Sequence, residues 1–252
     1  MPNKYKKYAL KKDARVGEIV KTYGVEFVNN PEHKPHMHNQ NRPYLIIHRE
    51  ESGKFLALKL SSKIRGYMSE FKIFPSKYSE NQILTKTSVA DMRYITELEP
   101  QDITENGFVL DENDLNNLYG KILRLYSINE TNISDEHAKI IFQYYIKNRK
   151  IVPGTVIKIK YCENYLLVLK ENENDYTCLP LYRSKTEFTH DEINVLNNHP
   201  SYVDYDEDYS VPKEETCFIM SFYTDEQVMN HVFGRINSRK RYYKLKEQKN
   251  TQ

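Results

Sequence analysis

Residues 42–60 read Arg-Pro-Tyr-Leu-Ile-Ile-His-Arg-Glu-Glu-Ser-Gly-Lys-Phe-Leu-Ala-Leu-Lys-Leu, and this stretch determines how the first half of the chain folds. Two short apolar runs, residues 44–48 and residues 55–60, are separated by the turn-forming residues Glu51-Ser52-Gly53. Apolar runs of this length, joined through a glycine-containing turn, predict a β-hairpin. We therefore expect the first half to be built outward from this pair of strands.

Further short strands are predicted on both sides of the hairpin. A first strand covers residues 15–27, and residues 29–41 form a loop rich in Asn, His and Pro. Two more strands follow at residues 71–74 and residues 82–90. The last of these is predicted to have one face formed by Ile83, Thr85, Thr87 and Val89.

Two helices are predicted after these strands. Asp111 is suited to cap the first helix, whose apolar residues recur at helical spacing. These residues are Leu115, Leu118, Ile122 and Leu125. Ser134 begins the second helix, with an apolar side formed by Ala138, Ile141, Tyr144 and Tyr145. A run of strands followed by helices indicates the α+β class.

A second strand-rich region begins at Val152 and repeats the outline of the first half. Its predicted strands cover residues 156–159, 165–169, 176–181 and 217–222. Residues 16–20 resemble residues 153–157, residues 42–47 resemble residues 164–168, and residues 55–62 resemble residues 176–184. This likeness predicts a duplicated small domain.

The remainder of the second half is predicted to be helical or irregular. Thr189 and Glu192 form a capping box, which predicts a short helix bearing Ile193 and Leu196. Residues 202–209, rich in Asp and Tyr, predict a mobile loop. A last helix, capped by Thr224 with Gln227 and bearing Val228, Val232 and Ile236, is predicted to run out into a basic tail.

These patterns predict four segments. Residues 13–127 form a first domain with its terminal helix, residues 128–150 a helical linker, residues 151–238 a second strand-rich domain, and residues 239–252 a basic tail.

The composition is typical of a globular protein. The chain has 252 residues, of which 39% are hydrophobic and 29% are charged, which excludes a disordered chain. No apolar run approaches the roughly 20 residues of a membrane helix, and residues 1–12 lack the apolar core of a secretory signal. We therefore expect a cytoplasmic protein. Cys162, Cys178 and Cys217 contain no Cys-x-x-Cys pair and are expected to be free thiols.

Charge is strongly segregated along the chain. The net charge is +8 in residues 1–65 and +6 in residues 235–249, but −7 in residues 97–140 and −8 in residues 187–215. The basic blocks could hold a polyanion such as nucleic acid. Alternatively they are solvated faces that the acidic blocks neutralise within the chain.

The order and spacing of several short motifs resemble the MazF/PemK toxins. These motifs are Gly17-Glu18-Ile19-Val20, Arg42-Pro43, Leu58-Lys59-Leu60-Ser61-Ser62 and Lys63-Ile64-Arg65-Gly66-Tyr67. The resemblance covers residues 13–127 and implies a small SH3-like β-barrel followed by helices. The likeness of the two halves then predicts a degenerate second barrel in the C-terminal half. It also implies an endoribonuclease that cuts single-stranded RNA without a metal or other cofactor and is restrained by an antitoxin, either protein or RNA.

The resemblance places the catalytic pair of this family on Arg42 and Ser61, although the family usually has Thr at the second position. Independently of the resemblance, the chemistry of phosphodiester cleavage requires groups of these two kinds. An Arg fork matches two phosphate oxygens, and a hydroxyl can donate to a developing oxyanion. The alternative without function is that both residues are ordinary polar residues at strand ends. The residues expected to bind RNA are Lys59, Ser62, Lys63 and Arg65.

The loop before Arg42 contains His33, His36 and His38. Histidine titrates near neutral pH, so His36 or His38 could act as a general base or acid beside Arg42. The pattern His-x-x-His-x-His could instead hold a metal, or the three residues could belong to a solvated loop.

Three functions therefore remain open at this point. The first is a metal-independent endoribonuclease of toxin type, the second a non-catalytic barrel that binds RNA or a protein, and the third a purely structural role. The second half has Asn164-Tyr165 where the first has Arg-Pro, with Arg183-Ser184 at the other strand end. An active chain could therefore be a homodimer, or a pseudo-dimer whose inactive second domain replaces the partner.

Overall fold

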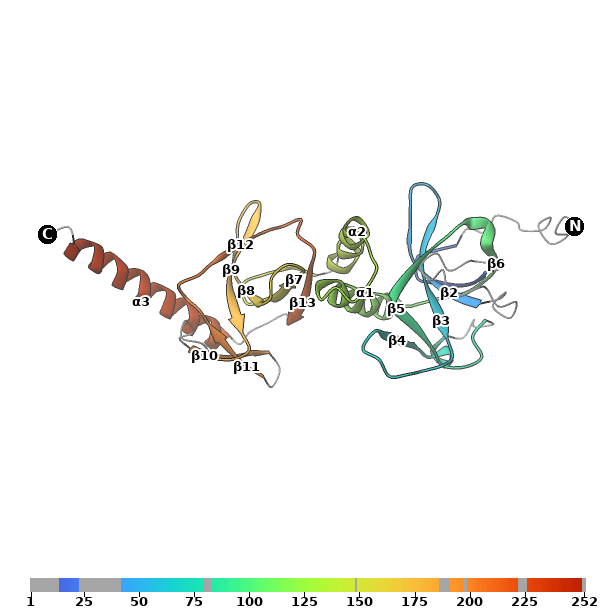
Figure 1. The fold of residues 1–252 in the computed structure, drawn as a ribbon, viewed down its shortest axis with the longest axis horizontal. Coiled ribbons are helices and arrows are strands. Elements are labelled where there is room, and N and C mark those ends of the chain that lie inside the picture. The colour runs from blue at the N-terminus through green and yellow to red at the C-terminus, as the bar shows by residue number, and fades with distance from the viewer. Residues whose placement is uncertain are drawn as a thin grey trace, which may run out of the picture. The chain divides into compact units, whose positions relative to one another are not determined.

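A computed structural model describes residues 14–22, 42–78, 83–147, 149–185, 191–196, 199–221 and 226–250. Within these residues the chain is α+β, and its strands form two antiparallel sheets (Figure 1). The chain divides into two compact units, Met1–Tyr144 and Tyr145–Gln252, which we call unit 1 and unit 2. None of the helices in the described part of the chain is long and apolar enough to cross a membrane.

Unit 1 is built on a six-stranded sheet that contains the predicted hairpin. Its strands are β1 (Glu18–Thr22), β2 (Arg42–Arg49), β3 (Phe55–Ser61), β4 (Glu70–Ile73), β5 (Ser88–Leu98) and β6 (Ile103–Val109). They are hydrogen-bonded in the order β4-β5-β3-β2-β1-β6. The hairpin of β2 and β3 is thus central, and its apolar residues Leu45, Ile46 and Leu58 are fully buried.

Gly17 marks the entry to β1. It has a φ of +85°, a conformation that residues with a side chain rarely adopt. Its N–H donates to the Ile46 carbonyl (2.8 Å), and its carbonyl accepts from the Leu110 N–H (2.9 Å). The glycine of the sequence motif therefore has a local structural role, because it joins the start of β1 to β2 and to the end of β6.

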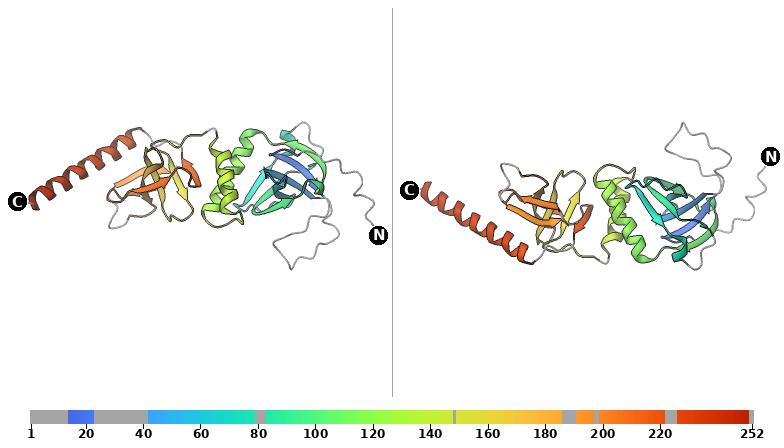
Figure 2. Two further views of the ribbon diagram at one scale, coloured as in Figure 1. Left: turned by 90° about the horizontal axis from the view of Figure 1, so that it is seen from above. Right: turned by 90° about the horizontal axis from the view of Figure 1, so that it is seen from below.

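The two predicted helices are present as α1 (Glu112–Ser127) and α2 (Asp135–Ile146). They lie beside each other along one side of the sheet of unit 1 (Figures 1 and 2). The predicted caps are confirmed, because the Asp111 carboxylate accepts from the Asp114 N–H (2.7 Å) and the Ser134 hydroxyl oxygen accepts from the His137 N–H (3.1 Å). The Tyr119 hydroxyl donates to the Ile47 carbonyl (2.9 Å) and so joins α1 to the sheet.

The predicted strand over residues 82–90 is wrong for its described residues 83–87. The strand begins at Ser88 and continues as β5 to Leu98, so the predicted face of alternating residues does not form. Ile83 instead packs over the backbone of β6, where a Cβ on Gly107 would stand only 2.7 Å from the Ile83 Cδ1. Strand β6 was not predicted, because its run Thr104-Glu105-Asn106-Gly107 looks polar.

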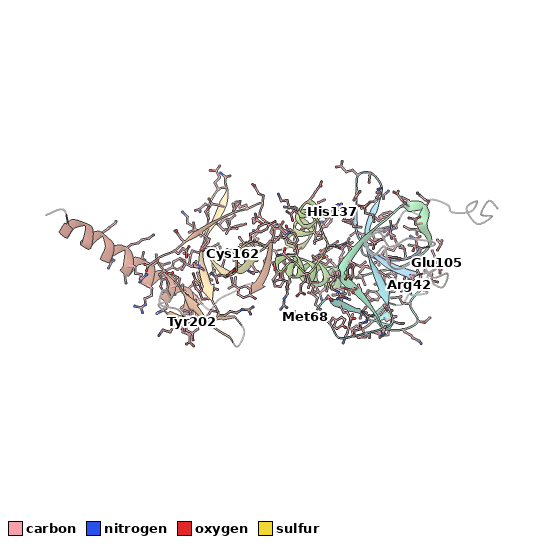
Figure 3. All side chains as sticks on the ribbon, viewed as in Figure 1. Arg42, Met68, Glu105, His137, Cys162 and Tyr202 are labelled. Atoms are coloured by element: carbon pink, nitrogen blue, oxygen red, sulfur yellow. The ribbon has the colours of Figure 1, made fainter. Side chains whose placement is uncertain are left out.

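Unit 2 contains a second antiparallel sheet and one long helix. Its strands are β7 (Val156–Ile159), β8 (Tyr165–Glu171), β9 (Asp175–Tyr182), β10 (Asp191–Leu196), β11 (His199–Val203), β12 (Tyr209–Pro212) and β13 (Cys217–Ser221), and its helix is α3 (Glu226–Asn250). The sheet order is β10-β11-β9-β8-β7-β13, and β12 pairs with β9. Cys178 and Cys217 are buried free thiols, and Cys162, which follows β7 (Figure 3), is a half-buried one.

Two expectations for unit 2 are corrected. Residues 191–196 form strand β10 rather than a helix, because they pair with β11; Thr189 and Thr224 lie outside the described residues. Residues 202–209 are not one loop, since they end β11 and begin β12. The predicted last helix is α3, which includes the basic tail as far as Asn250, and within the tail Arg239 forms an ion pair with Asp206.

The two sheets have the same strand order. If strands are numbered along each unit and β12 is set aside, both sheets read 4-5-3-2-1-6, and a helix follows the last strand in each. Gly154 has a φ of +91° and donates to the Val168 carbonyl (2.8 Å), as Gly17 does to Ile46. The predicted likeness of the two halves is therefore matched by equal topology.

The strand registers agree as well. Leu45 pairs with Leu58 in unit 1 and Leu167 with Leu179 in unit 2, and both hairpins have a register shift just beyond this pair, after Ile46 and after Val168. Strand β12 of unit 2 corresponds to the second part of β5 in unit 1. Residues 95–98 of β5 pair with the first part of β3, and β12 pairs in the same way with the first part of β9. Positions in the two units can therefore be matched residue by residue.

His48 connects the sheet of unit 1 to α2. Its side chain is buried, and its Nδ1 lies 3.2 Å from the Tyr144 hydroxyl oxygen. Burial lowers the pKa of His48, and the charge of the nearby His137 lowers it further against the opposing effect of Glu50. The neutral imidazole is therefore the form that the fold stabilises.

The free energy of unfolding should fall as the pH is lowered below about 6.5, the ordinary pKa of histidine. In that window the unfolded chain binds a proton at His48 that the folded chain does not, so acid favours unfolding until the lowered folded-state pKa is passed. Urea titrations at pH 7.5 and pH 5.5 on the wild type and on His48→Gln measure this difference. An equal loss of stability in both proteins would contradict the assignment.

Candidate functional site

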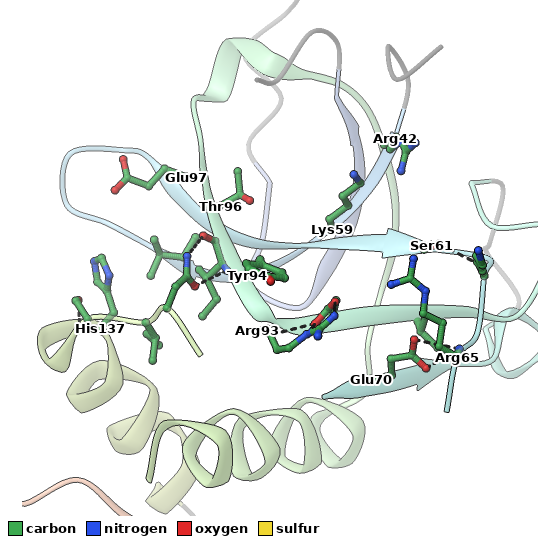
Figure 4. Close-up of a pocket in the computed structure, with 18 residues that line it drawn as sticks. Arg42, Lys59, Ser61, Arg65, Glu70, Arg93, Tyr94, Thr96, Glu97 and His137 are labelled. Carbon is green, nitrogen blue, oxygen red and sulfur yellow. Dashed lines mark hydrogen bonds and ion pairs between the residues drawn. The ribbon is translucent and has the colours of Figure 1, made fainter. Parts of the chain in front are cut away.

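A cavity of about 740 Å³ opens on unit 1 beside strands β3 and β5 (Figure 4). We call it the β3–β5 pocket. Its lining combines cationic, acidic and aromatic side chains, among them Arg42, Lys59, Ser61, Lys63, Arg65, Glu70, Asp91, Arg93, Tyr94, Asn132 and His137.

The pocket exists because β3 and β5 lose register at one point. Leu58 pairs with Ile95, but Leu60 pairs with Ala90, so residues 91–94 of β5 stand opposite Lys59 alone. An excess of residues on one strand bends it away from its partner and re-aims its side chains. The extra residues of β5 therefore form one wall of the pocket, and Lys59 lies at its base.

The loop between α1 and α2 stabilises this irregular part of β5. The Asn132 side chain accepts from the Ile95 N–H (2.8 Å) and donates to the Ile95 carbonyl (3.2 Å). The Asn132 N–H donates to the Arg93 carbonyl (3.0 Å), and the Thr131 hydroxyl donates to the Met92 carbonyl (2.9 Å). Backbone groups that leave the β3 ladder thus find other partners, which allows the bulge to persist.

Arg42 and Lys59 bring two positive charges to the same face of the sheet. Tyr44 pairs with Lys59, and counting two residues further places Arg42 opposite Ser61. Figure 4 shows Arg42 and Lys59 on neighbouring strands, with Ser61 further along β3. Lys59 is half-buried, and burial together with the charge of Arg42 lowers its pKa to about 8. Lys59 can therefore exchange a proton near neutral pH.

Ser61 and the loop after it form the far end of the pocket. The Ser61 hydroxyl oxygen accepts from the Lys63 N–H (3.1 Å), and such a hydroxyl still has its own proton to donate. The Glu70 carboxylate accepts from the N–H groups of Arg65 (3.0 Å) and Gly66 (2.8 Å). Because one carboxylate holds two consecutive amides, the loop that carries Lys63 and Arg65 has a fixed path.

Arg93 projects from the extra residues of β5. Its Nε and Nη2 donate to the Asp91 carboxylate at 2.9 Å and 2.6 Å, which is a two-point ion pair (Figure 4). The guanidinium carbon also lies 5.5 Å from the centre of the Tyr67 ring and 5.3 Å from that of Tyr94. Both rings are about half exposed, at 52% and 55%.

The structure brings together most of the residues that the sequence singled out. Arg42, Lys59, Ser61, Lys63 and Arg65 all line the pocket. Ser62 follows Ser61 on the adjoining loop and is exposed. The candidates His36 and His38, with His33, lie outside the described residues, and within the described residues no cluster of three or more His, Cys, Asp or Glu side chains could hold a metal ion.

Sequence reasoning missed the wall formed by Asp91, Arg93 and Tyr94. The predicted strand ended at residue 90, one residue before this wall begins. The adjacent pair Arg93-Tyr94 was the available signal, but its meaning depends on a register shift that no local pattern reveals.

Unit 2 has different residues at the matching positions. Leu166 pairs with Pro180 as Tyr44 pairs with Lys59, so Pro180 stands where Lys59 is. Counting from the same pairs matches Arg42 to Asn164 and Ser61 to Tyr182. The segment that corresponds to residues 91–94 is residues 204–207, Asp-Tyr-Asp-Glu. The cations of the β3–β5 pocket are therefore absent at these positions of unit 2, and carboxylates stand on the matching wall.

No family model matches the chain, and no curated protein matches it. Among solved structures, the Mycobacterium tuberculosis toxin MazF-mt6 superposes on 42% of this chain and 93% of its own, with 16% sequence identity and a TM-score of 0.32.

The pKa of Lys59 should rise when Arg42 is removed, because the guanidinium charge disfavours a protonated neighbour. Reductive methylation with ¹³C-formaldehyde followed by NMR titration measures the pKa of each lysine. In the wild type one dimethyl-lysine signal, absent from Lys59→Arg, should titrate near 8, and in Arg42→Ala it should titrate at higher pH.

Arg49→Ala is the matched control, since Arg49 lies at the other end of β2. A Lys59 pKa that does not change in Arg42→Ala would show that the two side chains do not interact in solution.

Proposed function

We propose that unit 1 is an endoribonuclease that cleaves single-stranded RNA without a metal ion. The observation that carries this proposal is the convergence of Arg42, Lys59 and Ser61 on one pocket, with Lys59 poised to exchange a proton. Cleavage by the neighbouring 2′-hydroxyl requires a group that accepts its proton, a charge that stabilises the pentacoordinate phosphorus and a donor for the leaving oxygen. The pocket offers a side chain suited to each of the first two tasks.

In the proposed reaction, the neutral form of Lys59 accepts the 2′-hydroxyl proton as the 2′-oxygen bonds to phosphorus. Arg42 stabilises the added negative charge through its planar fork of donors, and the Ser61 hydroxyl donates to a non-bridging phosphate oxygen. The bond from phosphorus to the 5′-oxygen then breaks, and His36 or His38 is proposed to protonate that oxygen. The products are a 2′,3′-cyclic phosphate and a 5′-hydroxyl.

We further infer that unit 2 is a degenerate copy of unit 1 and has no nuclease site. Equal strand order, equal register and the two equivalent glycines support common descent of the units. Replacement of Lys59 by Pro180 and of Arg42 by Asn164 removes both the proton acceptor and the guanidinium. The SH3-like barrel implied by the sequence motifs, an antitoxin partner and a dimeric or pseudo-dimeric state are part of the same proposal.

Incubation of the full chain with a long single-stranded RNA in EDTA should give discrete fragments that end in cyclic phosphate. Arg42→Ala should lower kcat/KM by about 10²- to 10³-fold, the usual cost of removing a donor to a developing oxyanion. The kcat/KM of the wild type should pass through a maximum as pH is varied, because Lys59, with a pKa of about 8, must be deprotonated while the proposed histidine acid must be protonated, and kcat/KM reports the free enzyme.

Arg49→Ala is the matched control and should cleave like the wild type. Lys59→Arg keeps a positive charge but should lose activity, since its guanidinium cannot act as a base at these pH values. Intact RNA with every protein would favour a non-catalytic binding role. Full activity in Arg42→Ala would place the active site elsewhere in the chain, and a requirement for divalent metal would bring the histidines of residues 33–38 forward.

A further inference from the structure

One surface feature of unit 1 has no role in the proposed reaction. Tyr67, Arg93 and Tyr94 form a small platform in which one guanidinium lies within 5.5 Å of two ring centres. Met68, which follows Tyr67 in the chain, is 64% exposed (Figure 3). We call Tyr67, Arg93 and Tyr94 the Arg93 platform.

The Arg93 side chain is held in place by Asp91, whereas the two tyrosine rings are exposed to solvent. The two-point ion pair with Asp91 fixes the direction of the Arg93 guanidinium, and a further hydrogen bond from the Arg93 N–H to Asp91 Oδ1 (3.1 Å) fixes its backbone. Asn132 holds the next residues of the same strand. Both tyrosine rings nevertheless expose about half of their surface. A ligand that stacks here would lose little entropy in ordering the protein side chains.

We propose that the Arg93 platform stacks an unpaired nucleobase of the bound RNA, an inference that rests on the proposed function. Exposed aromatic rings and arginine planes bind splayed bases of single strands, since every base has a π face. Arg93 and Tyr94 line the same pocket as Arg42 and Lys59, so a chain whose phosphate lies at those cations has a neighbouring base within the same cavity.

The chemistry of the platform favours a base over a protein side chain or a duplex. Lys63 and Arg65 add positive charge to the lining of the same pocket, which suits a phosphate backbone. A paired base lies within its helix and cannot reach an aromatic face. In unit 2, the matching segment 204–207 is acidic, and its Asp206 pairs with Arg239 of α3. The platform is thus confined to the unit that has the cationic pocket.

The test is binding of the full chain to a fluorescent single-stranded 2′-O-methyl RNA, which lacks the attacking hydroxyl and stays intact. Tyr67→Ala and Tyr94→Ala should each weaken binding by about 5- to 150-fold, the range found when one stacking ring is removed. Tyr94→Phe should bind like the wild type, because the ring is kept. Tyr161→Ala, which removes a tyrosine that is 78% exposed in unit 2, is the matched control and should have no effect.

Two further measurements separate stacking from charge. Tyr94→Ala should leave the salt dependence of binding unchanged, whereas Lys63→Ala should lower the slope of log K against log salt by about 0.7 for one phosphate contact. With an oligonucleotide in which abasic residues replace the bases, wild type and Tyr94→Ala should bind equally.

Equal binding of the wild type and both tyrosine variants to the intact oligonucleotide, together with weaker binding by Lys63→Ala, would overturn the platform and leave the proposed function standing. A wild type that neither binds this oligonucleotide nor cleaves RNA would overturn both. A tyrosine effect that persisted with the abasic oligonucleotide would show that the rings act on the protein or on the backbone, and would also overturn stacking.

Discussion

The loss of register between β3 and β5 is the constraint on which the rest of the site depends. Leu58 and Leu60 remain paired with β5, but their partners Ile95 and Ala90 are separated by four residues instead of one. Because of this excess, residues 91–94 do not pair with β3, and Lys59 lines the β3–β5 pocket. The irregular backbone persists because Thr131, Asn132 and the Ser69 carbonyl bond to it. The loop between the helices thus maintains the shape of the pocket, although it belongs to another part of the sequence.

The electrostatics of the pocket follow from that geometry. A lysine that is half-buried beside an arginine is less costly to keep neutral than one in water, so its pKa falls to about 8. Two carboxylates that line the pocket, those of Glu70 and Asp91, form hydrogen bonds with other groups of unit 1. Glu70 accepts from the amides of the loop after β3, and Asp91 orients Arg93. The acidic groups therefore position the cations of unit 1 through specific bonds. In unit 2, with Pro180 and Asn164 at the equivalent positions, acidic residues occupy the matching wall without those cations.

The central hairpin, the caps at Asp111 and Ser134 and the likeness of the two halves could be predicted from sequence, because each depends on local pattern. The positions of Arg42 and Ser61 on adjoining strands followed from the same hairpin together with the family resemblance. Strand β6 and the true course of β5 could not be predicted, since Asn106 and Gly107 look like turn residues and the strand signal at Ile83 was misleading. Strand β10 looked like a helix because Glu192 suited a capping box, and pairing with β11 overrode that local preference. The wall of Asp91, Arg93 and Tyr94 depends on a register shift between distant segments.

The most direct test of the account is hydrogen exchange of the full chain, followed by mass spectrometry, with and without a 2′-O-methyl single-stranded RNA. The account predicts that RNA slows exchange in peptides that cover residues 59–67 and residues 91–96, the two walls of the β3–β5 pocket, and leaves residues 204–209 of unit 2 unchanged. Protection confined to unit 2, or bound RNA with no protection on either wall of the pocket, would contradict the claim that this pocket is where the chain meets RNA.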